Sequence, residues 1–144
     1  VKEEFEKSGK EVNDGMDIAL CSLEGNQLEY AGARIPLWII RDGEIIEIKG
    51  DRQPIGKYGS QKPYTTHTFN LQEGDLIYIF SDGFVDQFGG EKGKKFKIQP
   101  FRDLLLSVHE NNMYDQKTMI YKTFEDWKGD LEQIDDICVI GVRI

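Results

Sequence analysis

Cysteine and histidine are scarce in this chain, with two residues of each type among 144. Cys21 and Cys138 lack Cys or His neighbours at the spacing of a zinc site or a redox pair, and His67 and His109 each stand alone. Both cysteines lie inside apolar strand patterns. We therefore expect two buried, reduced thiols of a cytoplasmic protein, and neither a disulfide scaffold nor a zinc module.

Long apolar runs are also missing. No stretch approaches the roughly 20 residues needed to cross a bilayer, and no secretory signal is visible, so we expect no membrane contact by this segment. The length is typical of one domain with its own core. Because the chain begins with Val1 instead of Met, we expect it to be a piece of a longer protein.

The chain also lacks a region of dense positive charge. The net charge is −8, and the nearest approach to a basic cluster, residues 91–97, contains four lysines and one glutamate. Nucleic acid is therefore not expected as a partner. Short charged runs are usually solvated loops; the alternative is that these lysines steer a phosphorylated protein towards a site just after Asp86.

The most informative stretch of the sequence is a short apolar run, residues 76–80. It is rich in β-branched and aromatic residues, and turn residues flank it on both sides, which predicts a strand buried on both faces. Asp82 follows the end of this strand. The pair Asp82-Gly83 is consistent with a simple turn, as Asp42-Gly43 is, or with a carboxylate held rigidly at a metal or phosphate site.

A second acidic site favours the metal interpretation. Asp135 and Asp136 precede an apolar terminal strand that we expect to begin at Ile137. If this strand runs antiparallel to residues 76–80, one of the two carboxylates lies at the same sheet edge as Asp82, since successive strand residues point to opposite faces. Carboxylate oxygens suit hard cations such as Mg²⁺ or Mn²⁺.

The remaining pattern predicts strands followed by helices. Residues 16–23, 27–31, 36–40 and 44–48 read as an antiparallel meander, 50–63 as the longest loop, and 64–71 as a further strand. A helix beginning near Pro100 with Phe101, Leu104, Leu105 and Val108 on its apolar face is expected, and then one over residues 115–128 with Met119, Ile120, Phe124 and Trp127. This order predicts an α+β layered fold of antiparallel sheets flanked by helices.

Five stretches in this order resemble the metal-dependent PP2C-type serine/threonine phosphatases, in particular their bacterial SpoIIE/RsbU-like branch. They cover most of the chain from about Gly15 to Ile144. The stretches are Tyr30-Ala31-Gly32-Ala33 followed by Pro36-Leu37-Trp38-Ile39-Ile40, Gln53-Pro54-Ile55-Gly56, Leu71-Gln72-Glu73-Gly74-Asp75, Ser81-Asp82-Gly83-Phe84, and Asp135-Asp136-Ile137.

The resemblance implies an αββα sandwich with two Mn²⁺ or Mg²⁺ ions. Asp82 and Asp135 would be metal ligands, Asp136 would support the ligands, and Asp86 would help to hold a further, weaker ion. In similar phosphatases a metal-bound water attacks phosphoserine or phosphothreonine. The substrate would be a phosphorylated regulatory protein, and sensor or regulatory domains would be attached upstream.

Two segments that supply ligands in this family, an earlier strand and an Asp-Gly-His-Gly-like turn, have no counterpart here. Residues 1–144 therefore resemble the C-terminal part of a single phosphatase domain, with an incomplete sandwich, and we expect this part to be inactive alone. Exposed sheet edges left by the missing strands suggest a homodimer. The rival hypothesis is a non-catalytic interaction module with the same fold. A nucleotidyl cyclase is less consistent, because base-binding and phosphate-cradling motifs are absent.

Overall fold

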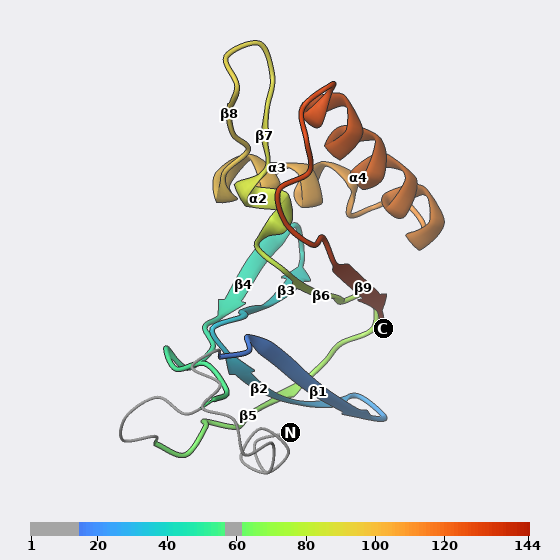
Figure 1. Cartoon of the computed structure of the whole chain (residues 1–144). Helices are drawn as coiled ribbons and strands as arrows, with labels where there is room; N and C mark the ends of the chain where they lie inside the picture. Colours follow the sequence, from blue (N-terminus) through green and yellow to red (C-terminus); the bar gives the residue numbers. More distant parts are fainter. Residues whose placement is uncertain (1–14, 57–61) are drawn as a thin grey trace. The chain divides into compact units, whose positions relative to one another are not determined.

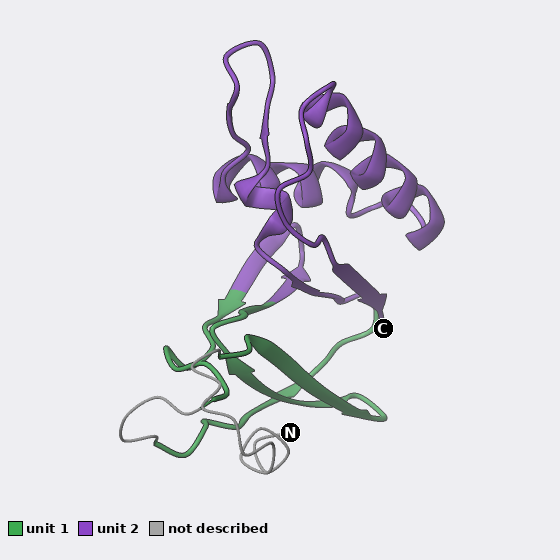
Figure 2. Ribbon diagram, in the orientation of Figure 1, with its two compact units in different colours: residues 1–37, 47–73 green, residues 38–46, 74–144 purple. Residues whose placement is uncertain are grey.

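The structure is a computed structural model that describes residues 15–56 and 62–144 (Figure 1). The chain forms two compact units (Figure 2). Unit 1 comprises residues up to 37 together with 47–73, and unit 2 comprises residues 38–46 and 74–144. Part of the expected long loop, residues 57–61, lies outside the described residues.

Unit 1 contains a three-stranded antiparallel sheet in the order β1-β2-β5. The strands are β1 (Ile18–Glu24), β2 (Gln27–Ala33) and β5 (His67–Asn70). A tight turn joins β1 to β2, so that Glu24 pairs with Gln27, and Gly25 in this turn has a φ of 60°. Such a positive φ is easily adopted by glycine. The expected hairpin around Gly25 is confirmed.

The expected four-stranded meander is wrong, because β2 pairs with β5 and the next two strands enter another sheet. The chain leaves the first sheet at Arg34, whose φ of 63° interrupts the extended backbone. The Tyr30 hydroxyl donates to the carbonyl of Ile35 and fixes this turn. A Cβ at Gly32 would collide with the same region, so glycine permits the close approach.

The second sheet has the order β4-β3-β6-β9. Its strands are β3 (Leu37–Arg41), β4 (Glu44–Ile48), β6 (Leu76–Phe80) and β9 (Val139–Arg143). Asp42 and Gly43 both have positive φ in the turn between β3 and β4, as a tight hairpin requires. Four of the five residues of β6 are at most 6% exposed, so the prediction of a strand buried on both faces is confirmed.

The rest of unit 2 follows β6. It consists of the short helix α2 (Gly83–Asp86), a hairpin of β7 (Phe88–Gly89) and β8 (Lys94–Lys95), and the helices α3 (Ile98–Val108) and α4 (Met113–Lys128). The two long helices agree with the prediction, except that α4 begins two residues earlier. Asn112 caps it by accepting a hydrogen bond from Asp115 N.

A single apolar core joins one face of the second sheet to the helices. Its sheet residues are Trp38, Ile40, Leu76, Tyr78 and Phe80, and its helix residues include Phe84, Phe101, Leu105, Val108, Ile120 and Phe124. The expected core position Met119 is wrong, since this side chain is 43% exposed. Gln116 is buried in its place, where it accepts a hydrogen bond from the Tyr78 hydroxyl.

The expected burial of the two cysteines is also wrong, because both are exposed. Cys21 lies on β1, an edge strand of its sheet, and Cys138 precedes the edge strand β9. Apolar alternation predicts a strand face but not whether that face is covered. The antiparallel sheets and helices confirm the α+β fold. No helix among the described residues is long and apolar enough to cross a membrane.

Candidate functional site

Asp82 lies where the central strand β6 passes into α2. It stands at the N-cap position of this helix, and its exposed side chain makes no capping hydrogen bond. The neighbouring strand β9 runs antiparallel to β6, with Phe80 opposite Val139. The start of β9 therefore lies beside the end of β6, which meets the condition set for a shared acidic edge. The strand begins at Val139 and not at Ile137 as expected.

Ser81 fastens the two acidic segments together. Its backbone N donates to Cys138 O at 2.9 Å, and its Oγ accepts a hydrogen bond from Cys138 N at 2.9 Å. The same hydroxyl donates to the carbonyl oxygen of Asp136 at 2.9 Å. The end of β6 and the segment before β9 are thus held by three hydrogen bonds around one serine. We call this arrangement the serine clamp.

Glycine at position 83 brings the two segments into direct contact. A Cβ built there would collide with the carbonyl oxygen of Asp136 and would crowd Ile137. Any larger residue would therefore push α2 away from the acidic segment. The serine clamp and Gly83 together place the backbone of Asp82 beside the backbone of Asp136.

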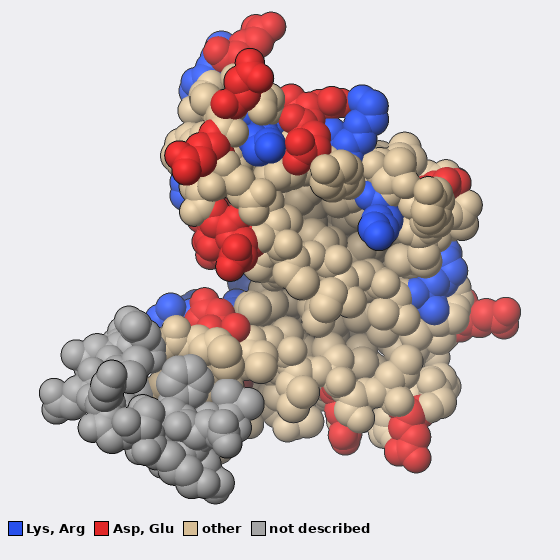
Figure 3. All heavy atoms as spheres, turned by 45° about the vertical axis from the view of Figure 1, so that its right-hand side comes forward, with Lys and Arg blue, Asp and Glu red and all other residues tan. Residues whose placement is uncertain are grey.

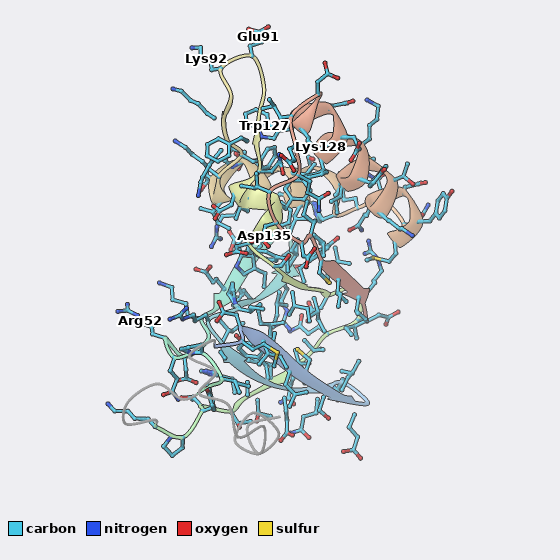
Figure 4. All side chains as sticks on the ribbon, viewed as in Figure 1. Arg52, Glu91, Lys92, Trp127, Lys128 and Asp135 are labelled. Atoms are coloured by element: carbon cyan, nitrogen blue, oxygen red, sulfur yellow. The ribbon has the colours of Figure 1, made fainter. Side chains whose placement is uncertain are left out.

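Asp135 and Asp136 are both exposed, and Asp135 lies on the segment that leads into β9 (Figure 4). The Asp135 carboxylate accepts a hydrogen bond from Asp136 N at 2.7 Å, while its backbone carbonyl accepts one from Gln133 Nε2 at 2.9 Å. These local bonds shape the turn before β9. They leave the Asp135 carboxylate able to accept further bonds, because each carboxylate offers about four acceptor positions.

Asp86 lies one helical turn after Asp82, and its backbone N donates to Asp82 O at 2.9 Å. Its carboxylate forms an ion pair with Lys95 Nζ at 3.1 Å. Both side chains are more than 40% exposed, so this pair is weak by the standard of buried pairs. The carboxylate that the resemblance assigns to a weaker ion is thus paired with an ammonium group here.

The side chains at this sheet edge carry the type of ligand atom that a hard divalent cation prefers. Asp82, Asp135 and Asp136 offer carboxylate oxygens and no nitrogen or sulfur. Within residues 15–56 and 62–144, no three His, Cys, Asp or Glu side chains gather closely enough to hold a metal ion. The edge therefore offers suitable ligands, but only part of a coordination sphere.

A buried glutamine stabilises this region through hydrogen bonds. It was not identified from the sequence. Gln87 is fully buried, and its Nε2 donates to the carbonyls of Glu132 at 2.9 Å and Phe88 at 3.0 Å. Its backbone carbonyl accepts a hydrogen bond from Trp127 Nε1 at 3.0 Å. The residue after α2 is thus tied to the segment that carries Asp135. A lone glutamine in a glycine-rich stretch gives no signal of this role.

A groove of about 680 Å³ opens in unit 2 between α4 and β9. Its lining is mainly apolar, with Ile120 and Phe124 on the helix and Val139 and Gly141 on the strand. In Figure 3 the middle of the face is mostly uncharged, and the charged side chains lie mainly towards its rim. The groove holds no cluster of candidate metal ligands among the described residues.

Comparison with known proteins gives a consistent result. The family model described as Stage II sporulation protein E (SpoIIE) matches residues 10–144. The SiaA-PP2C domain of Pseudomonas aeruginosa is 34% identical, with a TM-score of 0.75, over 83% of this chain and 47% of that one. No curated protein sequence matches the chain.

Two more distant structures share the fold. The PP2C phosphatase domain with a fragment of the regulatory domain of SpoIIE from Bacillus subtilis is 18% identical, with a TM-score of 0.67, over 89% of this chain and 37% of that one. The S. agalactiae serine/threonine phosphatase is 17% identical, with a TM-score of 0.67, over 97% and 64%. The chain thus spans less than two thirds of the length of these structures. It belongs to the SpoIIE family of PP2C-type phosphatase domains.

Proposed function

We propose that this chain is the C-terminal part of a metal-dependent protein phosphatase domain that hydrolyses phosphoserine or phosphothreonine in a regulatory phosphoprotein. The observation that carries the proposal is the serine clamp, which holds the strand end bearing Asp82 against the segment bearing Asp135 and Asp136. Membership of the SpoIIE family supports the same reaction.

The chain's own residues have separable tasks in this reaction. Asp82 and Asp135 hold Mn²⁺ or Mg²⁺ through their carboxylates, and Asp136 supports them through the carbonyl that Ser81 binds. When bound, the metal supplies activation of water and neutralisation of the charge that develops on the phosphoryl group. Ser81 and Gly83 keep the backbones of the two acidic segments beside each other.

The partial ligand set has a direct consequence for the isolated chain. Mg²⁺ and Mn²⁺ favour about six ligands, and a site with two or three carboxylates holds them weakly. Residues 1–144 alone are therefore inactive or nearly so, and the further ligands come from the remainder of the domain. The parent protein acts in bacterial signalling in the cytoplasm under the control of upstream sensor domains.

The test is Mn²⁺-dependent release of phosphate from a phosphoserine peptide by the parent polypeptide. Asp82→Asn is expected to abolish most of the activity and to weaken Mn²⁺ binding, which is followed independently by the loss of the free Mn²⁺ paramagnetic resonance signal. The control is Asp126→Asn, because Asp126 is an exposed carboxylate of α4 that pairs only locally with Lys122. Equal activity of both variants would refute the role of Asp82.

A second candidate function is a non-catalytic interaction module with the same fold. It is favoured by the lack of a three-ligand cluster among the described residues. In that case the parent polypeptide releases no phosphate at any Mn²⁺ concentration and shows no Mn²⁺ binding that depends on Asp82. Release of pyrophosphate from a nucleoside triphosphate in place of phosphate from the peptide would instead indicate a nucleotidyl cyclase.

A further inference from the structure

The hairpin of β7 and β8 forms a projecting arm, residues 88–97, which we call the basic arm. Its strands pair antiparallel, Phe88 with Lys95 and Gly89 with Lys94. The turn between them contains Gly90 and Gly93, both with positive φ. The loop extends away from α3, and Glu91 and Lys92 lie at its tip (Figures 1 and 4).

The base of the arm is fixed to the element that begins at Asp82. The backbone N atoms of Phe96 and Lys97 donate to the carbonyls of Gln87 and Val85 at 3.0 and 2.8 Å. Gly90 N donates to the carbonyl of Trp127 at 2.8 Å, on the last turn of α4. The base of the arm is therefore tied by backbone hydrogen bonds to α2 and to the end of α4.

One of the four lysines of the arm forms an ion pair within unit 2, and the other three do not. Lys95 pairs with Asp86 and lies over the Phe88 ring, 5.9 Å from its centroid. Lys92, Lys94 and Lys97 are exposed and form no ion pair with any residue in the described ranges.

This positive arm is set in an acidic protein. The chain has a net charge of −8, whereas residues 91–97 contain four lysines and one glutamate. A general attraction for acidic partners is therefore not a property of the whole surface, and any such attraction must be local. At physiological ionic strength the Debye length is about 8 Å, so the arm acts on groups that pass close to it.

We propose that the basic arm binds acidic residues that flank the phosphoserine of the substrate protein. This inference rests on the proposed phosphatase function, since the arm begins next to Asp82 and Asp86. Lys92 follows Asp86 by six residues, which span at most about 20 Å when extended. An extended substrate covers that distance in about six residues. The acidic residues that the arm contacts thus lie within about six positions of the phosphoserine.

Two fluorescent phosphoserine peptides test the proposal, one with four Asp residues three to six positions from the phosphoserine and one with Asn at those positions. Their binding to the parent polypeptide is measured by anisotropy in EDTA, so that no turnover occurs. We expect the Asp peptide to bind about tenfold more tightly. We expect the variant K92Q/K94Q/K97Q to lose this preference, because each exposed ion pair contributes a small and additive part.

The matched control is the variant K49Q/K62Q/K117Q, which removes the same charge from three exposed lysines outside the arm. It is expected to keep the preference for the Asp peptide. Equal losses in both variants would overturn the proposal, as would an arm variant that still prefers the Asp peptide. Tighter binding of a single-stranded RNA of equal charge would assign the arm to another class of partner and would overturn it too.

Kinetics separate a failure of the arm from a failure of the phosphatase function. In the active parent polypeptide, the arm variant is expected to raise KM for the Asp peptide about tenfold and to leave kcat unchanged. Hydrolysis of p-nitrophenyl phosphate, which has no flanking residues, should not change. A parent polypeptide without any Mn²⁺-dependent activity refutes the proposed function, whereas the binding experiment in EDTA still decides the role of the arm.

Discussion

The hydroxyl of Ser81 donates a hydrogen bond of 2.9 Å to the carbonyl oxygen of Asp136, 55 residues later in the chain. The hydroxyl oxygen of Ser81 also accepts a hydrogen bond from Cys138 N. One side chain thus satisfies the backbone on both sides of Ile137, between the acidic pair and the last strand. The position of the acidic pair depends on this serine as well as on the pairing of β6 with β9.

Replacing Ser81 with Ala is expected to destabilise unit 2 by about 1 kcal/mol, since the hydroxyl makes two hydrogen bonds but water can partly replace them. Urea unfolding measures the change. Mn²⁺ binding to the parent polypeptide should also weaken, because the acidic segment loses its support. The control is Ser107→Ala, whose hydroxyl bonds only to the carbonyl of Leu104 within α3. A Ser81 variant that loses stability but binds Mn²⁺ normally would contradict the positioning role.

Asp75 is expected to be the carboxylate on which the fold depends most. It is 2% exposed and accepts two hydrogen bonds from Arg41, at 2.9 Å from Nε and at 2.6 Å from the terminal nitrogen. Asp75 is buried but Arg41 is partly exposed, so Asp75→Ala should lower the free energy of unfolding by about 2 kcal/mol through the loss of the two hydrogen bonds. Thermal unfolding measures the change. The control is Asp126→Ala, which removes an exposed ion pair and should lower the free energy of unfolding by less than about 0.5 kcal/mol. Similar losses for both variants would contradict the prediction.

Alkaline pH is expected to destabilise the protein through Tyr78. Burial raises the pKa of Tyr78 from 10 to about 12 in the folded state. The unfolded chain therefore loses this proton first, and the stability present below pH 10 falls as the pH rises towards 12. A shift of two units corresponds to about 3 kcal/mol. Urea unfolding between pH 9 and 12 measures the loss.

The control for this titration is Tyr78→Phe. This variant is less stable at neutral pH because Gln116 Oε1 loses its donor, but its stability should fall less steeply between pH 10 and 12. Some loss of stability with rising pH should remain in this variant, since burial also raises the pKa of Tyr30 to about 12. An unchanged slope in the Tyr78 variant would show that another group causes the alkaline loss.

Residues 1–144 alone are expected to self-associate along β9, the last strand in its sheet. Ile140 and Val142 on this strand are 48% and 41% exposed, and an exposed apolar edge strand is a template for pairing with another chain. Sedimentation velocity at high concentration should show a dimer. Ile140→Lys should restore the monomer, because a charged edge residue opposes strand addition. A monomer without the substitution would refute the prediction.

Local sequence patterns were enough to predict the longer strands and helices of this fold, but not α2, β7 or β8. The burial of β6, the helical repeats of α3 and α4, and the turn at Asp42-Gly43 are each encoded within a few neighbouring residues. The antiparallel pairing of β9 with β6 was only a condition of the hypothesis of a shared acidic edge, and the structure meets that condition. The five motifs that resembled the SpoIIE branch led to the family to which the chain belongs.

Two of the errors came from contacts between distant residues, and one came from local backbone geometry. Asp75 looked like a turn residue, because its partner Arg41 lies 34 positions away. The meander failed at Arg34, whose positive φ has no strong sequence signal outside glycine. Gln116 took the core position expected for Met119 because the Tyr78 hydroxyl offered it a partner. The metal-ligand roles of Asp82 and Asp135 stay predictions.

The two ends of the basic arm differ in how much change they tolerate. A side chain at Gly89 would collide with the carbonyl of Trp127, whereas nothing lies within 4 Å of a Cβ added at Gly93. Insertions and substitutions can therefore accumulate between Gly90 and Gly93 while the anchored base stays constant. Under the proposed role of the basic arm, related chains can therefore differ in the charge of this tip, at the position of Lys92, without any change at the anchored base.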